Sequence, residues 1–465
     1  MFPKSTYVNR RKELKNLVGN GIILLPGNEE VGMNYAGNVY PFRQDSTFLY
    51  YFGLDKPGLT AIIDIDNNQE IIFGNDPTVE EIVWTGPQVS LVDMAVECGV
   101  TDVRTEEQLE SAIKQAKSSN RVIHYLPPYR YRSIFRLSEY FDKKPHWTVN
   151  HASIELIKAV AAQRSIKDDE EIREIEKAVE ITAWMHKRAM EFAKPGMLEM
   201  EVAAEINKVA LESGPGLSFP SIVTVRGEVL HNQSYKNILR EGQLLLVDAG
   251  AESSLHYAGD MSRTFPVNHH FSEVQKQVYQ IALDSLKSGV NMLKPGTRYL
   301  DVHLTAARTI VEGFKLMGLM KGDAEEAVTA GAHTLFFQCG TGHMMGLDVH
   351  DMENLGEQYV GYTDNLKKST EFGLKSLRLG KELEPGYVVT VEPGIYFIPN
   401  LIDTWKHDKK LEAFINYDEV EKFRNFGGLR SEDDYVITKD GAQRLGPKVA
   451  EEISEIEAIR GRALN

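Results

Sequence analysis

The chain has 465 residues, and its 52 lysines and arginines against 67 aspartates and glutamates give a formal net charge of −15. This acidic balance argues against a protein that coats nucleic acid, because such proteins need basic patches. An apolar fraction of 42% argues against a disordered chain. The length favours two or three domains.

The sequence also indicates the compartment in which the protein works. Its two cysteines, Cys98 and Cys339, are too few for a disulfide framework, so a reducing environment is expected. The first apolar run, Gly21–Leu25, is too short for the core of a signal peptide, and no run approaches the roughly 18 apolar residues of a membrane span. We therefore expect a soluble, cytoplasmic protein that binds neither membranes nor nucleic acid.

The first third of the chain mixes strand-like and helix-like segments. Short apolar runs bounded by turn residues predict strands at Gly21–Pro26, Thr60–Ile65 and Glu70–Phe73, and the last two are expected to form a hairpin. Helical spacing predicts helices at Thr105–Ala116 and Ala152–Gln163. This alternation is typical of an α/β or α+β unit.

A polar break at Arg164–Glu171 separates this region from the rest of the chain. Within it, Ser165 or Asp168 is a candidate N-cap for a long amphipathic helix. We place a domain boundary here, which divides the chain into residues 1–164 and 165–465. The alternative is a surface loop inside a single domain.

The second part contains two similar sequence segments, called here the internal echo. Leu239–Gly250 lines up with Leu383–Gly394 without a gap, and both segments read as a turn, an apolar strand, a carboxylate and a glycine. Chance alone can produce such a match, since strands are often bounded by glycine. A duplicated half-domain would also produce it, and would predict a pseudo-two-fold arrangement in which each half delivers an acid at a strand end.

Two later segments complete the outline. The polar stretch between Asp351 and Lys381 has no strong periodicity and is expected to be a surface insertion. Val449–Arg462, rich in glutamate and isoleucine, is a candidate C-terminal helix.

Two aspartates stand out in the echo's first half. Asp248 follows the apolar run Leu244–Val247, and a carboxylate on so apolar a strand needs a partner or a metal. If Glu252–Leu255 is a hairpin loop, Asp260 lies directly opposite Asp248, with Cβ atoms roughly 5 Å apart. Such a pair of like charges is repulsive unless a cation lies between them. The alternative is two unrelated acids that flank a hairpin.

Histidines and glutamates follow in the second half. His343 and His350 lie in a glycine-containing segment, where the backbone is free to approach a metal, although a single histidine is more often structural. Glu392 ends an apolar strand, and Glu432 opens an acidic run that enters another. The rest of that run, Asp433 and Asp434, is expected to be solvated.

The candidates are more informative together than singly. Four carboxylates and one imidazole, each beside a glycine or at a strand end, form a hard, oxygen-rich ligand set that suits Mn, Mg, Co(II) or Zn. Five ligands are too many for one tetrahedral zinc site but suit two metal ions roughly 3.5–4 Å apart. The proposed ligands are Asp248, Asp260, His343, Glu392 and Glu432.

The order of these ligands resembles the dinuclear site of the pita-bread metallopeptidases. Thr341–Asp351, Thr390–Tyr396 and Gly428–Asp434 resemble the proline-specific branch, as does Tyr257–Pro266. Tyr40–Gly53 resembles the additional first domain of the Xaa-Pro aminopeptidase (aminopeptidase P) family, which is close to prolidase. The resemblance covers nearly the whole chain.

The resemblance implies a fold and a set of roles. It implies an N-terminal α/β domain of the aminopeptidase P type, followed by a pseudo-two-fold pita-bread catalytic domain. His231 and His350 match the family's substrate-side histidines, Arg430 matches an arginine near the site, and Glu392 would both hold metal and carry a proton. Cys339 departs from the pattern, because close relatives often have histidine there.

The resemblance also implies an activity. A metal-bridging hydroxide would attack the carbonyl carbon that precedes proline and release the N-terminal residue of peptides with proline in second position. Two divalent ions are expected, most often Mn(II), with Co(II) or Zn(II) as alternatives, and relatives form homodimers or homotetramers. The alternatives are an Xaa-Pro dipeptidase (prolidase) and a non-catalytic binding module on the same fold.

Overall fold

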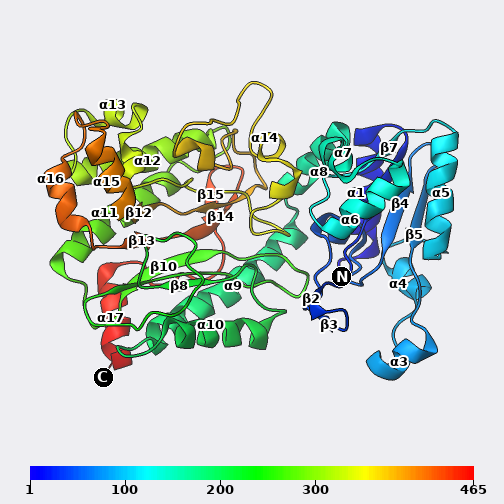
Figure 1. Ribbon diagram of the computed structural model, residues 1–465, viewed down its shortest axis with the longest axis horizontal. Coiled ribbons are helices and arrows are strands. Elements are labelled where there is room, and N and C mark those ends of the chain that lie inside the picture. The colour runs from blue at the N-terminus through cyan, green and yellow to red at the C-terminus, as the bar shows by residue number, and fades with distance from the viewer. Residues whose placement is uncertain (465) are drawn as a thin grey trace. The chain divides into compact units, whose positions relative to one another are not determined.

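The computed structural model describes residues 1–464, which form two compact units (Figure 1). The first unit contains Met1–Arg164 and, from much later in the chain, Met352–Val360. The second contains Ser165–Asp351 and the chain from Gly361 onward. The architecture is mixed α/β, as the sequence predicts.

The first unit is built on a five-stranded sheet of order β6-β5-β4-β1-β7. The predicted strands and the hairpin between β4 and β5 are confirmed, since these two strands pair antiparallel around a turn at Asn68. The apolar faces of the strands pack against Leu109 and Ile113 of the predicted helix. The strands of this unit are β1 (Ile22–Pro26), β2 (Gly32–Tyr35), β3 (Asn38–Val39), β4 (Thr60–Asp64), β5 (Gln69–Phe73), β6 (Asp102–Arg104) and β7 (Ile123–His124).

The helices of this unit include both predicted helices, as α5 and α8. They are α1 (Lys4–Val18), α2 (Ser46–Phe52), α3 (Val79–Thr85), α4 (Leu91–Glu97), α5 (Glu106–Ser118), α6 (Tyr131–Phe141), α7 (Pro145–Asn150) and α8 (Ile154–Ser165). The short helices η2 (Glu353–Leu355) and α14 (Glu357–Val360) also belong to this unit.

The stretch between Asp351 and Lys381, expected to be a surface insertion, is partly buried, so this expectation is wrong in part. Leu355 and Val360 are buried, and Asn354 Nδ2 donates a hydrogen bond to the carbonyl of Pro127, 2.7 Å away. Further along, Leu377 and Leu379 are also buried. The sequence conceals this because the apolar residues that pack are widely spaced among polar ones.

The second unit has helices on both sides of its central strands (Figure 1). Its strands are β8 (Ile222–Thr224), β9 (Leu244–Ala249), β10 (Met261–Pro266), β11 (Val388–Val391), β12 (Gly394–Tyr396), β13 (Gly428–Arg430), β14 (Asp433–Ile437) and β15 (Ala442–Arg444). Its helices are α9 (Asp169–Phe192), α10 (Glu199–Ser213), α11 (Glu273–Val290), α12 (Tyr299–Leu316), α13 (Ala324–Thr329), η1 (Ala332–Leu335), η3 (Leu374–Ser376), α15 (Pro399–His407), α16 (Tyr417–Val420), η4 (Glu421–Phe423) and α17 (Ile453–Leu464).

The second unit opens with the predicted long helix, α9. Asp168, rather than Ser165, is its N-cap: the carboxylate accepts from the backbone N–H groups of Glu170 and Glu171. Glu171 completes a capping box, which satisfies the otherwise unpaired N–H groups of the first turn.

The two echoing segments form corresponding strands. β9 pairs antiparallel with β10, and β11 pairs antiparallel with β14, so each half has a strand that ends at a carboxylate beside a neighbouring strand. An isolated bridge between Ser262 and Glu432 joins the two halves. This junction brings the acids of both halves together.

The predicted register of the first hairpin is wrong by two residues. Asp248 lies opposite Ser262 rather than Asp260. The turn lies one residue further along the chain than expected, with Ser253 N–H donating to the carbonyl of Tyr257 and His256 in a positive-φ conformation. A shift of two preserves the face of a strand, so Asp248 and Asp260 still project to the same side as diagonal neighbours.

Among residues 1–464, none of the helices combines the length and the apolar character that crossing a lipid bilayer requires.

Candidate metal centre

The site forms where strand ends of the two halves meet. Asp248 lies near the end of β9, Asp260 directly precedes β10, Glu392 directly follows β11, and Glu432 directly precedes β14. Because these strands are buried along their whole length, the acids at their ends are held below the surface. His343 comes from the long loop after η1.

Glycines make the close approach of the first hairpin possible. A Cβ atom on Gly250 would collide with the carbonyl oxygen of Gly259, and one on Gly259 would lie 2.8 Å from the backbone of Ala178 in α9. The two glycines therefore allow the ends of β9 and β10 to lie close together and against α9.

Three of the predicted ligands form a compact group. One ligand atom from each of Asp260, His343 and Glu432 lies within 4.8 Å of the others. His343 Nε2 is 3.4 Å from Asp260 Oδ2 and 3.7 Å from Glu392 Oε1. Asp248 lines the same pocket but is not part of the three-residue group. All five predicted ligands thus face one cavity.

Two of the buried acids have an oxygen atom that no hydrogen-bond donor reaches. Within the described part of the chain, Asp260 Oδ1 and Glu432 Oε1 are buried and accept no hydrogen bond. Burial, and then the charge of Asp248, raise the pKa of Asp260 to about 8. Burial and the neighbouring carboxylates also raise the pKa of Glu432 and of Glu392. Such a cluster is stable in its charged form only with cations among the oxygens.

The imidazole of His343 is oriented as a metal ligand. Its Nδ1 lies 3.0 Å from the carbonyl oxygen of Met344. A carbonyl only accepts, so Nδ1 carries the proton and Nε2 directs its lone pair at the carboxylates of Asp260 and Glu392. A lone pair facing anionic oxygens is repulsive unless a cation lies between them. The donor set therefore fits divalent metal.

Arg430 connects the carboxylates to the surrounding strands. Its guanidinium forms an ion pair with Asp248, donates to Ser262 Oγ at 2.9 Å and donates to Tyr396 Oη at 2.6 Å. Ser262 Oγ in turn donates to Glu432 Oε2 at 3.0 Å. Arg430 thus fixes acids of both halves through one planar group.

The rest of the acidic run after Glu432 is not solvated as expected. Asp433 and Asp434 are both buried. Asp433 pairs with Arg263 at 2.7 Å, and Asp434 accepts a hydrogen bond from the backbone N–H of Asp260 at 3.2 Å. The run looks solvated in the sequence because these partners, Arg263 in β10 and Asp260 just before it, come from a distant segment.

The acids open into a cavity of about 230 Å³. The two predicted substrate-side histidines, His231 and His350, line it, and the His350 ring lies 4.3 Å from that of His343. Burial and the charge of Arg430 lower the pKa of His231. The lining also includes apolar residues, namely Phe219, Pro220, Ile222, Leu230 and Val349.

Two further side chains line this cavity. Burial raises the pKa of Cys339 to about 12, so this residue stays a neutral thiol. Arg378, which sequence reasoning missed, belongs to the segment that was expected to be a surface insertion. No local pattern marks it, because its place in the cavity depends on how that segment packs.

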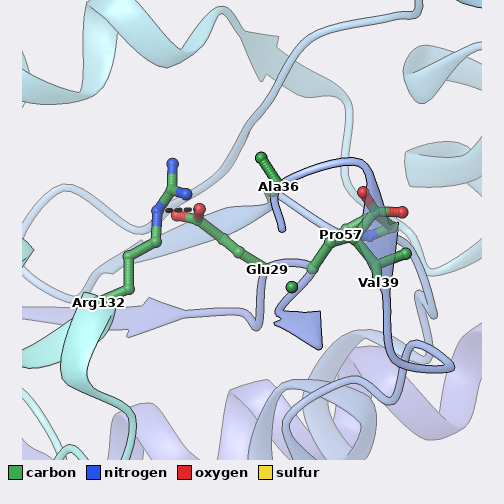
Figure 2. Close-up of a pocket in the computed structure, with 8 residues that line it drawn as sticks. Glu29, Ala36, Val39, Pro57 and Arg132 are labelled. Atoms are coloured by element: carbon green, nitrogen blue, oxygen red, sulfur yellow. Dashed lines mark ion pairs between the residues drawn. The ribbon is translucent and has the colours of Figure 1, made fainter. Parts of the chain in front are cut away.

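The first unit has a separate hollow of about 320 Å³ (Figure 2). Glu29 and Arg132, which both line it, point toward one another and form an ion pair. This pairing neutralises both charges, and the other lining residues include the apolar Ala36, Val39 and Pro57. The hollow therefore offers no cluster of unpaired acids like that of the second unit.

Comparison with known proteins agrees with this geometry. The sequence model of "Metallopeptidase family M24" matches residues 173–439, which is more than half of the chain. The chain belongs to metallopeptidase family M24. The model "Aminopeptidase P, N-terminal domain" matches residues 7–124 of this M24 protein. The resemblance seen in the sequence motifs is confirmed.

Relatives match this M24 protein over most of its length. The Xaa-Pro aminopeptidase of Escherichia coli (strain K12) is 30% identical, and the match covers 91% of this chain and 90% of that protein. The Xaa-Pro dipeptidase of Homo sapiens is also 30% identical, over 93% of this chain and 87% of that protein.

Solved structures confirm the fold. Zinc-substituted E. coli aminopeptidase P in complex with product has a TM-score of 0.82 and 29% identity, with full coverage of both chains. Pseudomonas aeruginosa aminopeptidase PepP gives a TM-score of 0.82 at 26% identity, covering 100% of this chain and 99% of that one. The predicted pita-bread domain, preceded by an aminopeptidase P type domain, is therefore confirmed.

Proposed function

We propose that this M24 enzyme is an Xaa-Pro aminopeptidase that removes the N-terminal residue from peptides with proline in second position. The observation that carries the proposal is the convergence of four carboxylates and one imidazole in a cavity whose lining also includes apolar residues. This convergence argues against the non-catalytic alternative, since a binding module has no need to bury unpaired acids.

We propose that two divalent ions bind Asp248, Asp260, His343, Glu392 and Glu432, with Mn(II) as the expected metal. Support comes from the unpartnered oxygens of Asp260 and Glu432 and from the tautomer of His343. Bound there, the ions would supply Lewis acidity and lower the pKa of a water molecule. The hard oxygen set permits manganese, and equally Co(II) or Zn(II).

The chain's own residues are proposed to bind the substrate and move its protons. Glu392, which directly follows β11 and is partly exposed, would accept a proton and deliver it to the leaving proline nitrogen. His350 and His231 would donate hydrogen bonds to the oxyanion that develops on the scissile carbonyl. Arg430 would act through Asp248, which it holds in place.

The apolar residues of the lining give a reason for proline specificity. An Xaa–Pro bond has no N–H, so an enzyme that reads this group fails on it. A pocket lined by Phe219, Ile222 and Leu230 can instead select the ring by its shape and apolar surface. Substrate recognition would therefore depend on the second residue more than on the first.

Peptide length separates the proposal from the dipeptidase alternative. Purified protein supplied with Mn(II) is expected to cleave Ala-Pro-Ala well and Ala-Ala-Ala poorly. Activity confined to Ala-Pro would favour the dipeptidase, and activity on none of the three would overturn the proposal. Glu432→Gln serves as the inactive control.

One observation favours the dipeptidase alternative. Arg378 lines the cavity, and a guanidinium is a suitable partner for the free carboxylate at the end of an Xaa-Pro dipeptide. If this contact matters, Arg378→Met should raise KM for Ala-Pro far more than for Ala-Pro-Ala-Ala. Equal effects on both peptides would remove this support.

The proposal extends to assembly and location. We propose residues 1–164 and 165–465 as the two domains, apart from Met352–Val360, which belongs to the first unit. We also propose self-association into a homodimer or homotetramer, and a cytoplasmic location. Support for self-association comes from α3, where Val79, Val83 and Trp84 are largely exposed. Support for the cytoplasm comes from Cys98 and Cys339, which are both free thiols.

A further inference from the structure

We infer that Lys167 is a positioning residue for His350: its buried ion pair with Asp351 holds the loop that carries His350 beside the strand that leads to Glu392. The inference rests on the proposed function only for the catalytic consequence. The position of His350 itself is measurable without activity.

The ion pair is short and completely enclosed. Lys167 Nζ lies 2.8 Å from Asp351 Oδ2, and each side chain is only 1% exposed. Removing two charges from water costs several kcal/mol per ion, and an apolar pair of similar volume is often as stable or more so. Stability alone therefore gives little reason for charges at this place, whereas a fixed geometry does.

Lys167 is anchored to the strand that ends at Glu392. Its backbone N–H donates to the carbonyl of Gly386, 2.9 Å away, in the turn before β11. Asp351 is anchored to the metal-site loop, because its N–H donates to the carbonyl of Met344 at 2.9 Å. The ion pair thus joins the strand of Glu392 to a loop that starts at His343 and ends at His350.

The backbone of Gly346 packs directly against the pair. A Cβ on Gly346 would lie 2.6 Å from Asp351 Oδ2 and 3.0 Å from Lys167 Cε. The carbonyl of Gly346 accepts from Ala258, 2.8 Å away, just before Asp260. A shift of the pair would therefore displace the loop and the adjoining hairpin together.

The chain path explains why this loop needs an anchor. Directly after Asp351 the chain enters Met352–Val360, which belongs to the other compact unit. The chain directly before Ser165, which ends at Arg164, also belongs to that other unit. The loop that carries His350 is therefore followed directly by a segment of the other unit, and the ion pair with Lys167 fixes the residue after His350 to the second unit.

The test uses the double variant Lys167→Met/Asp351→Asn, which removes both charges and leaves no buried ion. We expect kcat for Ala-Pro-Ala to fall about 10–100-fold, as for other residues that orient a site group. KM and the number of bound metal ions should stay at wild-type values. The control is Arg188→Met/Glu205→Gln, which neutralises a partly exposed ion pair between α9 and α10 and should leave kcat unchanged.

A double-mutant cycle identifies His350 as the residue through which Lys167 acts. In the His350→Ala background, the same double variant should cause no further loss of kcat, because the group it positions is already absent. Additive losses, or an unchanged kcat in the wild-type background, would overturn the inference.

A spectroscopic readout keeps the inference separate from the proposed function. In Zn(II)-loaded protein labelled at histidine Cε1, the His350 resonance is the one missing from His350→Ala. It should shift or split in the double variant and stay unchanged in the α9–α10 control. No change would overturn the inference. A change in a protein that cleaves none of the peptides would overturn only the proposed function.

Discussion

Nε2 of His343 lies 3.4 Å from Oδ2 of Asp260, and it faces that oxygen with a lone pair because Nδ1 donates to the carbonyl of Met344. When Asp260 is ionised, these two acceptors lie close together in a buried site and repel one another. A cation between them converts the repulsion into two coordination bonds. The charged form of this site therefore requires a bound metal ion.

Removal of a ligand should cost both metal and rate. Asp260→Asn and Glu432→Gln keep the size of each side chain but remove a charged oxygen. We expect each to lose at least about 100-fold in kcat/KM, which is the upper effect of merely orienting residues. Metal analysis of the purified variants should show less than the wild-type content. Wild-type rate together with wild-type metal would exclude the residue as a ligand.

In the metal-free protein, Asp260 should make the stability of the folded state depend on pH. Its folded pKa of about 8 lies above the value of about 3.9 in an unfolded chain. The contribution of Asp260 to the free energy of unfolding is therefore complete below about pH 4 and is lost as the pH rises through about 8. Asp260→Asn imitates the neutral form, so in EDTA it should become progressively more stable than wild type between these pH values.

Thermal denaturation at several pH values measures this difference. Comparison with the variant cancels the contributions of other groups, such as Asp64, whose pKa is about 2 because of Arg121. Added Mn(II) should stabilise wild type most at the upper end of the range and Asp260→Asn little. A constant difference in Tm across the range would contradict the expectation.

His350→Ala should separate metal binding from turnover. His350 lines the cavity beside His343 but is not one of the five expected ligands. Loss of one hydrogen-bond donor to an oxyanion costs about 2.7–4 kcal/mol, or roughly 100–1,000-fold in kcat. Metal content should stay the same. His231→Ala provides the parallel measurement, and an unchanged kcat in either variant would remove that histidine from the mechanism.

Much of the fold follows from local pattern. The strand ending at Asp248 and the strand ending at Glu392 are predictable because a fully apolar run stops at a carboxylate and a glycine. Asp168 is predictable as an N-cap from its spacing to Glu171. The register of the first hairpin is not predictable in this way. It depends on a turn in which His256 adopts a positive φ, and the residue type alone does not indicate this conformation.

The site divides along the same line. The five proposed ligands are marked by strand ends and glycines, so sequence reasoning finds them. Arg378 and Lys167 carry no such mark, because the contacts that bring them to the cavity or to its loop are made with distant segments. For the same reason Asp433 looks solvated in the sequence, although Arg263 neutralises it inside the core.

Arg430 should matter for stability as well as activity. Arg430→Met leaves Asp248 buried among other acids, and breaking such a pair from one side costs about 3–5 kcal/mol. Chemical denaturation of the metal-free variant should show this loss, and added Mn(II) should recover part of it. Lys287→Met, which breaks a half-exposed pair with Glu452, is the control and should change little. Equal stability of Arg430→Met and wild type would contradict the role of Arg430 in holding Asp248.

The exposed face of α3 should be covered in solution by a second copy of the chain. Val79, Val83 and Trp84 are 81%, 76% and 84% exposed, and tryptophan is enriched at interfaces because it buries much area at little entropic cost. We expect Val83→Asp/Trp84→Asp to give a smaller particle in light scattering. Leu316→Asp is the matched control, since Leu316 is 92% exposed on α12 and a single exposed leucine needs no partner. An unchanged mass for both would show that α3 takes no part in assembly, whereas a reduced mass for α3 alone would identify it as the contact.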